Sequence, residues 1–77
     1  MKISEWTRTD TYVQYIIECK AWEKDKLFYW CEENIQRHSS IPYDPDWRWN
    51  FGRGPAGTMI YTFRNFEDAI AFKLRWM

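Results

Sequence analysis

The sequence predicts a small α+β domain, with an antiparallel sheet of three or four strands and two helices on one face. Two observations support this. Large apolar residues alternate with period two in 11–19, 47–51 and 59–63, whereas period-3.6 patterns occupy 21–37 and 66–77. The order is therefore strand, helix, strand, strand, helix. A chain of 77 residues has room for one domain, residues 1–77.

The first predicted strand is TYVQYIIEC, residues 11–19, which is rich in β-branched and aromatic side chains. Its alternation places one set on a single face: Val13, Tyr15, Ile17 and Cys19. The alternative is a long helix that starts at Asp10, although it would place Lys20 and Lys24 inside the apolar stripe. The segment KISEW can add a short edge strand before it.

Two helices follow from the apolar spacing. In 21–37 the inward face is Leu27, Phe28, Cys31 and Ile35, while Trp22 and Tyr29 project from the opposite side. In the last segment Asn65 can cap a helix whose expected inward stripe is Phe66, Ala69, Ile70, Leu74 and Met77. Phe72 and Trp76 are expected on the flank of that stripe. The residues between the first helix and the next strand, 38–46, are expected to form a loop because they include two prolines.

A hairpin is predicted around GRGPAG, residues 52–57. Trp47, Trp49 and Phe51 share one face of its first strand, and Met59, Tyr61 and Phe63 share one face of its second. GRGPAG also matches the dinucleotide pattern G-x-G-x-x-G. That motif must lead from a strand into a helix, whereas here a β-like run follows. We therefore interpret it as a hairpin loop.

Composition excludes several classes of function. Eleven basic and eleven acidic side chains give zero net charge, so no overall field attracts nucleic acid or an anionic membrane. No apolar run is long enough for a signal peptide or a membrane span, and we expect a cytoplasmic protein. The two cysteines are too few for a disulfide framework and are expected to be reduced and buried.

Catalytic or metal chemistry has little support in the sequence, and we expect no enzyme activity, cofactor or metal. Cys19 and Cys31 lack metal-ligand spacing, and His38 is the single histidine. A Cys31–His38 nucleophilic pair is formally possible, as is a small hydrolase or transferase that uses His38 with a nearby acid. Cys31 and His38 are both expected on the core side of the helix, where a thiol is inert.

Single-stranded nucleic-acid binding is the alternative function, because sheet aromatics beside arginines can stack on unpaired bases. The residues concerned are Trp47, Arg48, Trp49 and Arg53. The helices, however, need an apolar sheet face to pack on, and these rings provide it. We expect most of these rings to point inward, which argues against nucleic acid as the partner.

Aromatic residues outside this core indicate a protein interface. Trp22, Tyr29, Phe72 and Trp76 are the predicted contact residues, with Trp6, Tyr12 and Ile16 as further exposed candidates. A symmetric dimer is the simplest way to cover them. The alternative is that the N-terminal arm folds over this surface within one chain.

Three segments carry a resemblance: WCEENI, WRWNFGRGP and MIYTFRNFEDAIAFKLRWM. Together they resemble small uncharacterised accessory proteins of tailed bacteriophages, in which a similar strand enters a helix with Asp-Ala and Phe-x-Leu-Arg-Trp, here Asp68 to Trp76. The resemblance implies an accessory protein of the infected bacterial cytoplasm that binds a host protein or a virion component. The leading hypothesis is a non-enzymatic interaction protein that forms a homodimer.

Overall fold

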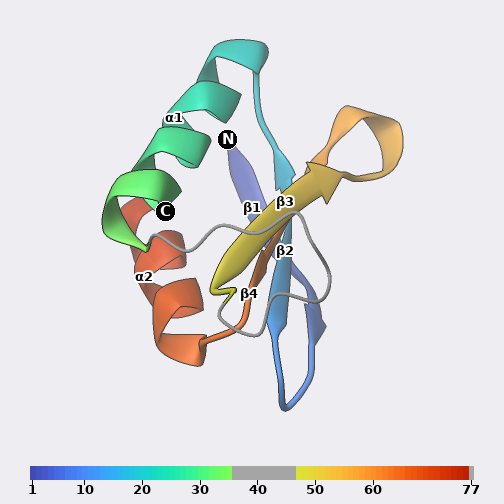
Figure 1. Cartoon of the computed structure of the whole chain (residues 1–77). Coiled ribbons are helices and arrows are strands. Elements are labelled where there is room, and N and C mark those ends of the chain that lie inside the picture. The colour runs from blue at the N-terminus through green and yellow to red at the C-terminus, as the bar shows by residue number, and fades with distance from the viewer. Residues whose placement is uncertain (36–46, 77) are drawn as a thin grey trace.

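The computed structural model describes residues 1–35 and 47–76 of the chain. Its strands and helices in chain order are β1 Lys2–Arg8, β2 Val13–Glu18, α1 Ala21–Asn34, β3 Trp49–Arg53, β4 Met59–Phe63 and α2 Phe66–Trp76. Both helices lie on the same side of the sheet (Figure 1). The predicted α+β class is confirmed, and KISEW forms part of a full edge strand. The loop expected at 38–46 lies outside the described residues.

The four strands form one antiparallel sheet in the order β1-β2-β4-β3. The strand predicted at 11–19 is present as β2, so the alternative helix from Asp10 is wrong. β2 lies between two neighbours, because Tyr15 pairs with Glu5 on one side and with Tyr61 on the other. A bulge between Glu5 and Thr7 interrupts the β1 register at Trp6. The central strands β2 and β4 carry most of the buried sheet residues, and Trp49 of the edge strand β3 lies with them.

The core is a cluster of rings between the sheet and the helices. Trp49, Tyr61 and Phe63 are fully buried, as the hairpin prediction required, whereas Phe51 at the edge is 39% exposed. The Trp49 and Tyr61 rings are stacked with centroids 6.0 Å apart. The Tyr15 hydroxyl is satisfied within this core, because it donates to the Ala69 carbonyl at 3.2 Å. Large rings thus supply the buried area that a chain of this length needs.

Helix α1 begins where the Glu23 side chain folds back on the chain. Its Oε1 accepts the Lys20 backbone N–H at 2.8 Å, and an acidic group in this first turn also suits the helix dipole. Leu27, Cys31 and Ile35 are buried against the sheet as predicted, and Phe28 is partly buried beside them. The predicted helix extended to 37, beyond the described residues.

The β3–β4 hairpin closes through a single 3₁₀ turn at Pro55–Gly57. Gly57 has φ of 77°, which favours glycine, and the Gly54 N–H donates to the Thr58 carbonyl at 2.9 Å. The glycine-rich segment therefore joins two strands and does not begin a helix, which agrees with the hairpin interpretation of GRGPAG.

The inward stripe expected for α2 is wrong for most of its members. Ala69 is buried, but Phe66, Ile70 and Leu74 are exposed. Phe72, predicted as a surface contact, is 0% exposed and its ring centroid lies 4.9 Å from Phe63. The face that meets the sheet is Ala69, Phe72 and Trp76, with i, i+3, i+7 spacing, and the alternative apolar stripe faces away.

Two contacts explain this rotation of α2. Arg48 donates two hydrogen bonds to the Asp68 carboxylate, from Nη2 at 2.8 Å and from Nε at 3.1 Å. The Ala69 carbonyl accepts from Tyr15. Both partners lie on the sheet side, so Asp68 and Ala69 must face it. The small Ala69 side chain also allows close approach of the helix, which directs Phe72 into the ring cluster.

Candidate interaction groove between the two helices

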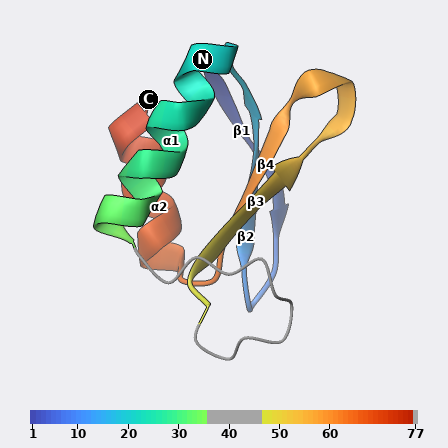
Figure 2. The same cartoon turned by 45° about the horizontal axis from the view of Figure 1, so that its top comes forward.

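The outer face of α1 carries a line of four side chains at i, i+4, i+7 and i+11. These are Trp22, Lys26, Tyr29 and Glu33, here called the α1 ridge. Leu27, Cys31 and Ile35 occupy the opposite face of the helix, so the ridge points away from the sheet. Helix α2 lies beside α1 on this side of the molecule (Figure 2).

Two adjoining hollows lie along the ridge, where the last turn of α2 meets α1. The first has a volume of about 350 Å³ and is lined by Met1, Trp22, Glu23, Lys26, Arg75 and Trp76. The second, of about 360 Å³, is lined by Lys26, Tyr29, Trp30, Glu33, Arg75 and Trp76. Because they share Lys26, Arg75 and Trp76, we treat them as one feature, the helix groove.

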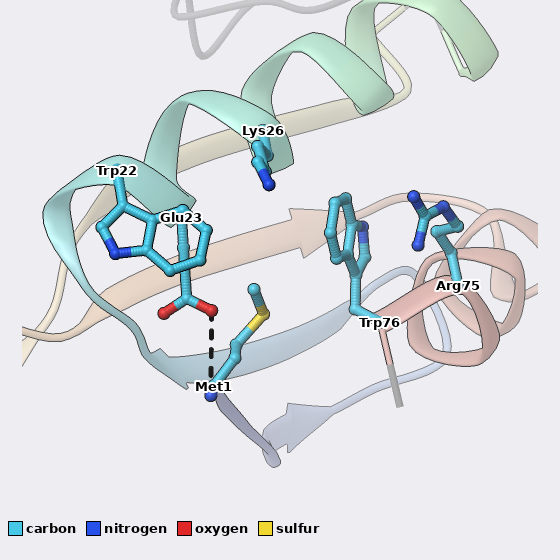
Figure 3. Close-up of a pocket in the computed structure, with 6 residues that line it drawn as sticks. All are labelled: Met1, Trp22, Glu23, Lys26, Arg75 and Trp76. Atoms are coloured by element: carbon cyan, nitrogen blue, oxygen red, sulfur yellow. Dashed lines mark ion pairs between the residues drawn. The ribbon is translucent and has the colours of Figure 1, made fainter.

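Cations in the helix groove lie over tryptophan rings. The Lys26 ammonium is 4.7 Å from the centroid of the Trp22 ring, and the Arg75 guanidinium carbon is 4.3 Å from that of Trp76. Figure 3 shows Lys26 and Met1 between Trp22 and Trp76. Within residues 1–35 and 47–76, neither Lys26 nor Arg75 has a carboxylate within 4.0 Å. Carboxylates of the described ranges therefore neutralise neither positive charge.

Glu23 and Trp76 complete the first hollow. Glu23 lies 3.9 Å from the Met1 ammonium, so this carboxylate is already compensated (Figure 3). The Trp76 ring is half-buried, and its Nε1 is buried with no hydrogen-bond acceptor in the described part of the chain. An unsatisfied donor of this kind costs about 1–3 kcal/mol. Trp76 thus has a polar group that residues 1–35 and 47–76 leave without an acceptor.

The structure brings three of the four predicted contact residues together. Trp22 and Tyr29 are 58% and 62% exposed, and Trp76 lies beside them in the helix groove. Phe72 is not among them, because it belongs to the core. The N-terminal arm places Met1 at the groove but leaves both exposed rings open, so it does not cover this surface.

Lys26 and Arg75 were not predicted as groove residues. Lys26 could have been found from the sequence, because it lies four residues after Trp22 and three before Tyr29 on one helical face. Arg75 gave no such signal, since its approach to α1 depends on how the two helices pack.

The residues proposed for nucleic-acid stacking do not form an exposed platform. Trp49 is 0% exposed and Trp47 is half-buried before the start of β3. Arg48 is held by Asp68, and Arg53 is exposed at the end of β3. The central ring of that arrangement is therefore a core residue, and the expectation that these rings mostly point inward is confirmed for Trp49.

The titratable groups of the core are kept neutral by burial. Burial raises the pKa of the Cys31 thiol strongly, with a smaller contribution from Glu32, and burial also raises the pKa of the Tyr61 hydroxyl. A protonated thiol is a poor nucleophile. His38, the other member of the formal pair, lies outside the described residues. Among residues 1–35 and 47–76, no cluster of three potential metal ligands occurs.

Comparisons with known proteins give no relative. No family model matches the sequence, and no curated protein or solved structure is significantly similar to it. In the described part of the chain, no helix has the length and apolar character needed to cross a membrane.

Proposed function

We propose that this protein is a non-enzymatic interaction protein that acts through protein–protein contacts made by the helix groove. The observation that carries the proposal is the exposure of Trp22 and Tyr29, 58% and 62%, beside a hollow lined by Trp76. Tryptophan and tyrosine are the residue types that most often dominate binding energy at interfaces. Their concentration on one helical face is unusual for a surface that contacts only water.

The charges of the groove support the same proposal. Lys26 and Arg75 are each held over an indole ring, which limits the conformational freedom that these long side chains would lose on binding. Neither is neutralised by a carboxylate in the described ranges. A partner can therefore gain both apolar contact with the rings and a charged contact at the rim.

The proposed biological setting follows the resemblance to accessory proteins of tailed phages. In that setting the protein acts in the bacterial cytoplasm, where its partner is a second copy of itself, a host protein or a virion component. A homodimer is the simplest of these, because one surface then serves as both halves of the interface.

A pull-down from host lysate tests the proposal with matched variants. The test variant is Trp22→Ala with Tyr29→Ala, which removes the exposed rings of the groove. The control is Phe66→Ala with Leu74→Ala, which removes two exposed apolar residues of α2 that do not line the groove. We expect the wild type and the control to retain a common partner band or self-association that the test variant loses. Equal retention by all three proteins would contradict the proposal.

A further inference from the structure

The α1 ridge has a definite order of charge along its length. Lys26 lies in the first half of α1 and Glu33 near its end, with Tyr29 between them. At 1.5 Å per residue, the two charged positions are about 10 Å apart along the helix axis. The sequence of groups from the helix start is thus aromatic, cationic, aromatic, anionic.

We infer that the helix groove is covered by α1 of a second copy, packed antiparallel about a twofold axis level with Phe28. This inference rests on the proposed function and names its partner. In this register Lys26 of one copy lies within one helical turn of both Tyr29 and Glu33 of the other copy, because heights along the two helices run in opposite directions. Measured along the helix axis, Trp22 of one copy is offset from Glu33 of the second copy by the rise of about one residue.

Antiparallel packing is required by the order of charge. Parallel packing would place Lys26 beside Lys26 and Glu33 beside Glu33, which is repulsive in both cases. Antiparallel packing replaces these two repulsive contacts with two contacts between Lys26 of one copy and Glu33 of the other. The twofold axis relates the two contacts to each other. The same surface is therefore complementary to itself.

A second copy fits this surface better than a uniformly charged segment. An acidic segment would meet Lys26 and Arg75 but would also meet Glu33 in the groove and the exposed Glu32 and Asp25 beside the ridge. A basic segment would be attracted by these acidic side chains but repelled by Lys26 and Arg75. The groove combines cations and an anion on one strip, and α1 itself carries the matching pattern.

The available area predicts a weak dimer. Each ring of Trp22 and Tyr29 has roughly 150–250 Å² of surface, of which more than half is exposed. The two rings thus offer on the order of 200–300 Å² per copy, whereas a standard interface buries about 800 Å² per partner. Contacts by Lys26, Glu33 and the Arg75–Trp76 pair add to this. We expect a dissociation constant in the micromolar range or weaker.

Sedimentation equilibrium of the full chain, from about 1 µM to about 1 mM, measures the dimer directly. The informative variants are Lys26→Glu, Glu33→Lys and the double variant that exchanges both charges. Each single variant creates two like-charge contacts and should weaken dimerisation by about tenfold or more. The double variant restores opposite charges and should recover affinity to within about threefold of wild type. Lys73→Glu, on an exposed part of α2 outside the groove, is the charge control and should dimerise like wild type.

Loss of folding does not explain the expected result. Lys26 and Glu33 are both exposed on α1, where substitutions change stability little, and in the described ranges the one intrachain contact that Lys26→Glu removes is the one with the exposed Trp22 ring. Circular dichroism melting should show each single variant folded, with a melting temperature close to that of the wild type. Recovery of dimer affinity in the double variant is a further control. If each single change weakened the dimer by unfolding the chain, the two changes together would not recover it.

The outcomes separate this inference from the proposed function. A wild type that stays monomeric at the highest concentration overturns the dimer, and the proposed function survives if a purified partner binds it and fails to bind the Trp22→Ala, Tyr29→Ala variant. A dimer that is insensitive to the charge exchange and to loss of both rings overturns the inference and shows that the copies associate elsewhere. A dimer with charge rescue and loss on ring removal supports both.

Discussion

Helical periodicity alone places Leu74 on the inward stripe of α2 and Phe72 on its flank, whereas in the structure Phe72 is buried and Leu74 is exposed. Truncation of each side chain measures this difference. Phe72 is enclosed by four rings, with centroid distances of 4.9 Å to Phe63, 5.3 Å to Tyr61, 5.9 Å to Trp30 and 6.2 Å to Tyr15. Leu74 is 67% exposed on the same helix. Truncation at the two positions should therefore have very different consequences.

Removing a buried phenylalanine side chain costs about 3–5 kcal/mol. A domain of 77 residues has a total stability of about 4–12 kcal/mol at roughly 0.05–0.15 kcal/mol per residue, so Phe72→Ala can prevent folding. Phe72→Leu keeps most of the apolar volume and loses the ring contacts. We expect it to lower the free energy of unfolding by about 1–2 kcal/mol. Leu74→Ala removes an exposed side chain and should change that free energy by less than about 0.5 kcal/mol.

Urea denaturation followed by tryptophan fluorescence gives both values, provided that the slope with denaturant is the same for each variant. In thermal melting, Phe72→Leu should lower the midpoint by about 4–16 °C, because 1 kcal/mol corresponds to about 4–8 °C in a domain of this size. If Leu74→Ala were the more destabilising change, α2 would face the sheet with Phe66, Ile70 and Leu74. The ring cluster described here would then be wrong.

Two further predictions concern the groups that orient and fill the core. The Arg48–Asp68 pair holds α2 against the sheet with two hydrogen bonds, so Asp68→Asn should lower the free energy of unfolding by about 1–2 kcal/mol. A double-mutant cycle with Arg48→Met should show coupling, and additive losses would mean that the pair contributes nothing. The pKa of the Cys31 thiol is raised above its ordinary value of 9.0 by burial, so the native thiol stays protonated while the unfolded thiol ionises above about pH 9. Stability is then retained below that pH and lost as the pH rises, and Cys31→Ala should reduce the loss between about pH 8 and about pH 10 by about 1 kcal/mol. A pH dependence identical in the wild type and the variant would show that Cys31 ionises as easily in the folded state as in the unfolded state.

The strands could be predicted because their signal is local. Alternation in β2 and in the hairpin strands specifies both the strand and the face that is buried, and a register shift by one residue would expose every core ring. The helical face of α1 could be predicted for the same reason, since Leu27, Cys31 and Ile35 form one apolar stripe. From that stripe it follows that Trp22 and Tyr29 are exposed.

The orientation of α2 could not be predicted, because its apolar arc is wider than the sheet can cover. Phe66, Ile70 and Leu74 form one stripe, and Ala69, Phe72 and Trp76 form another. Hydrophobicity does not separate them. The choice depends on contacts with other elements, which are the packing of Phe72 among the core rings and the Arg48–Asp68 pair, whose residues are 20 positions apart.

The amino-acid sequence by itself determined the α+β class, the inward rings of the hairpin and the exposed aromatics of α1, because each is a periodic pattern within one element. Only the tertiary structure decided which face of α2 is buried and that Arg75 and Trp76 meet Lys26 across a groove. Those relations join separate elements, and their energy comes from contacts that no single segment contains.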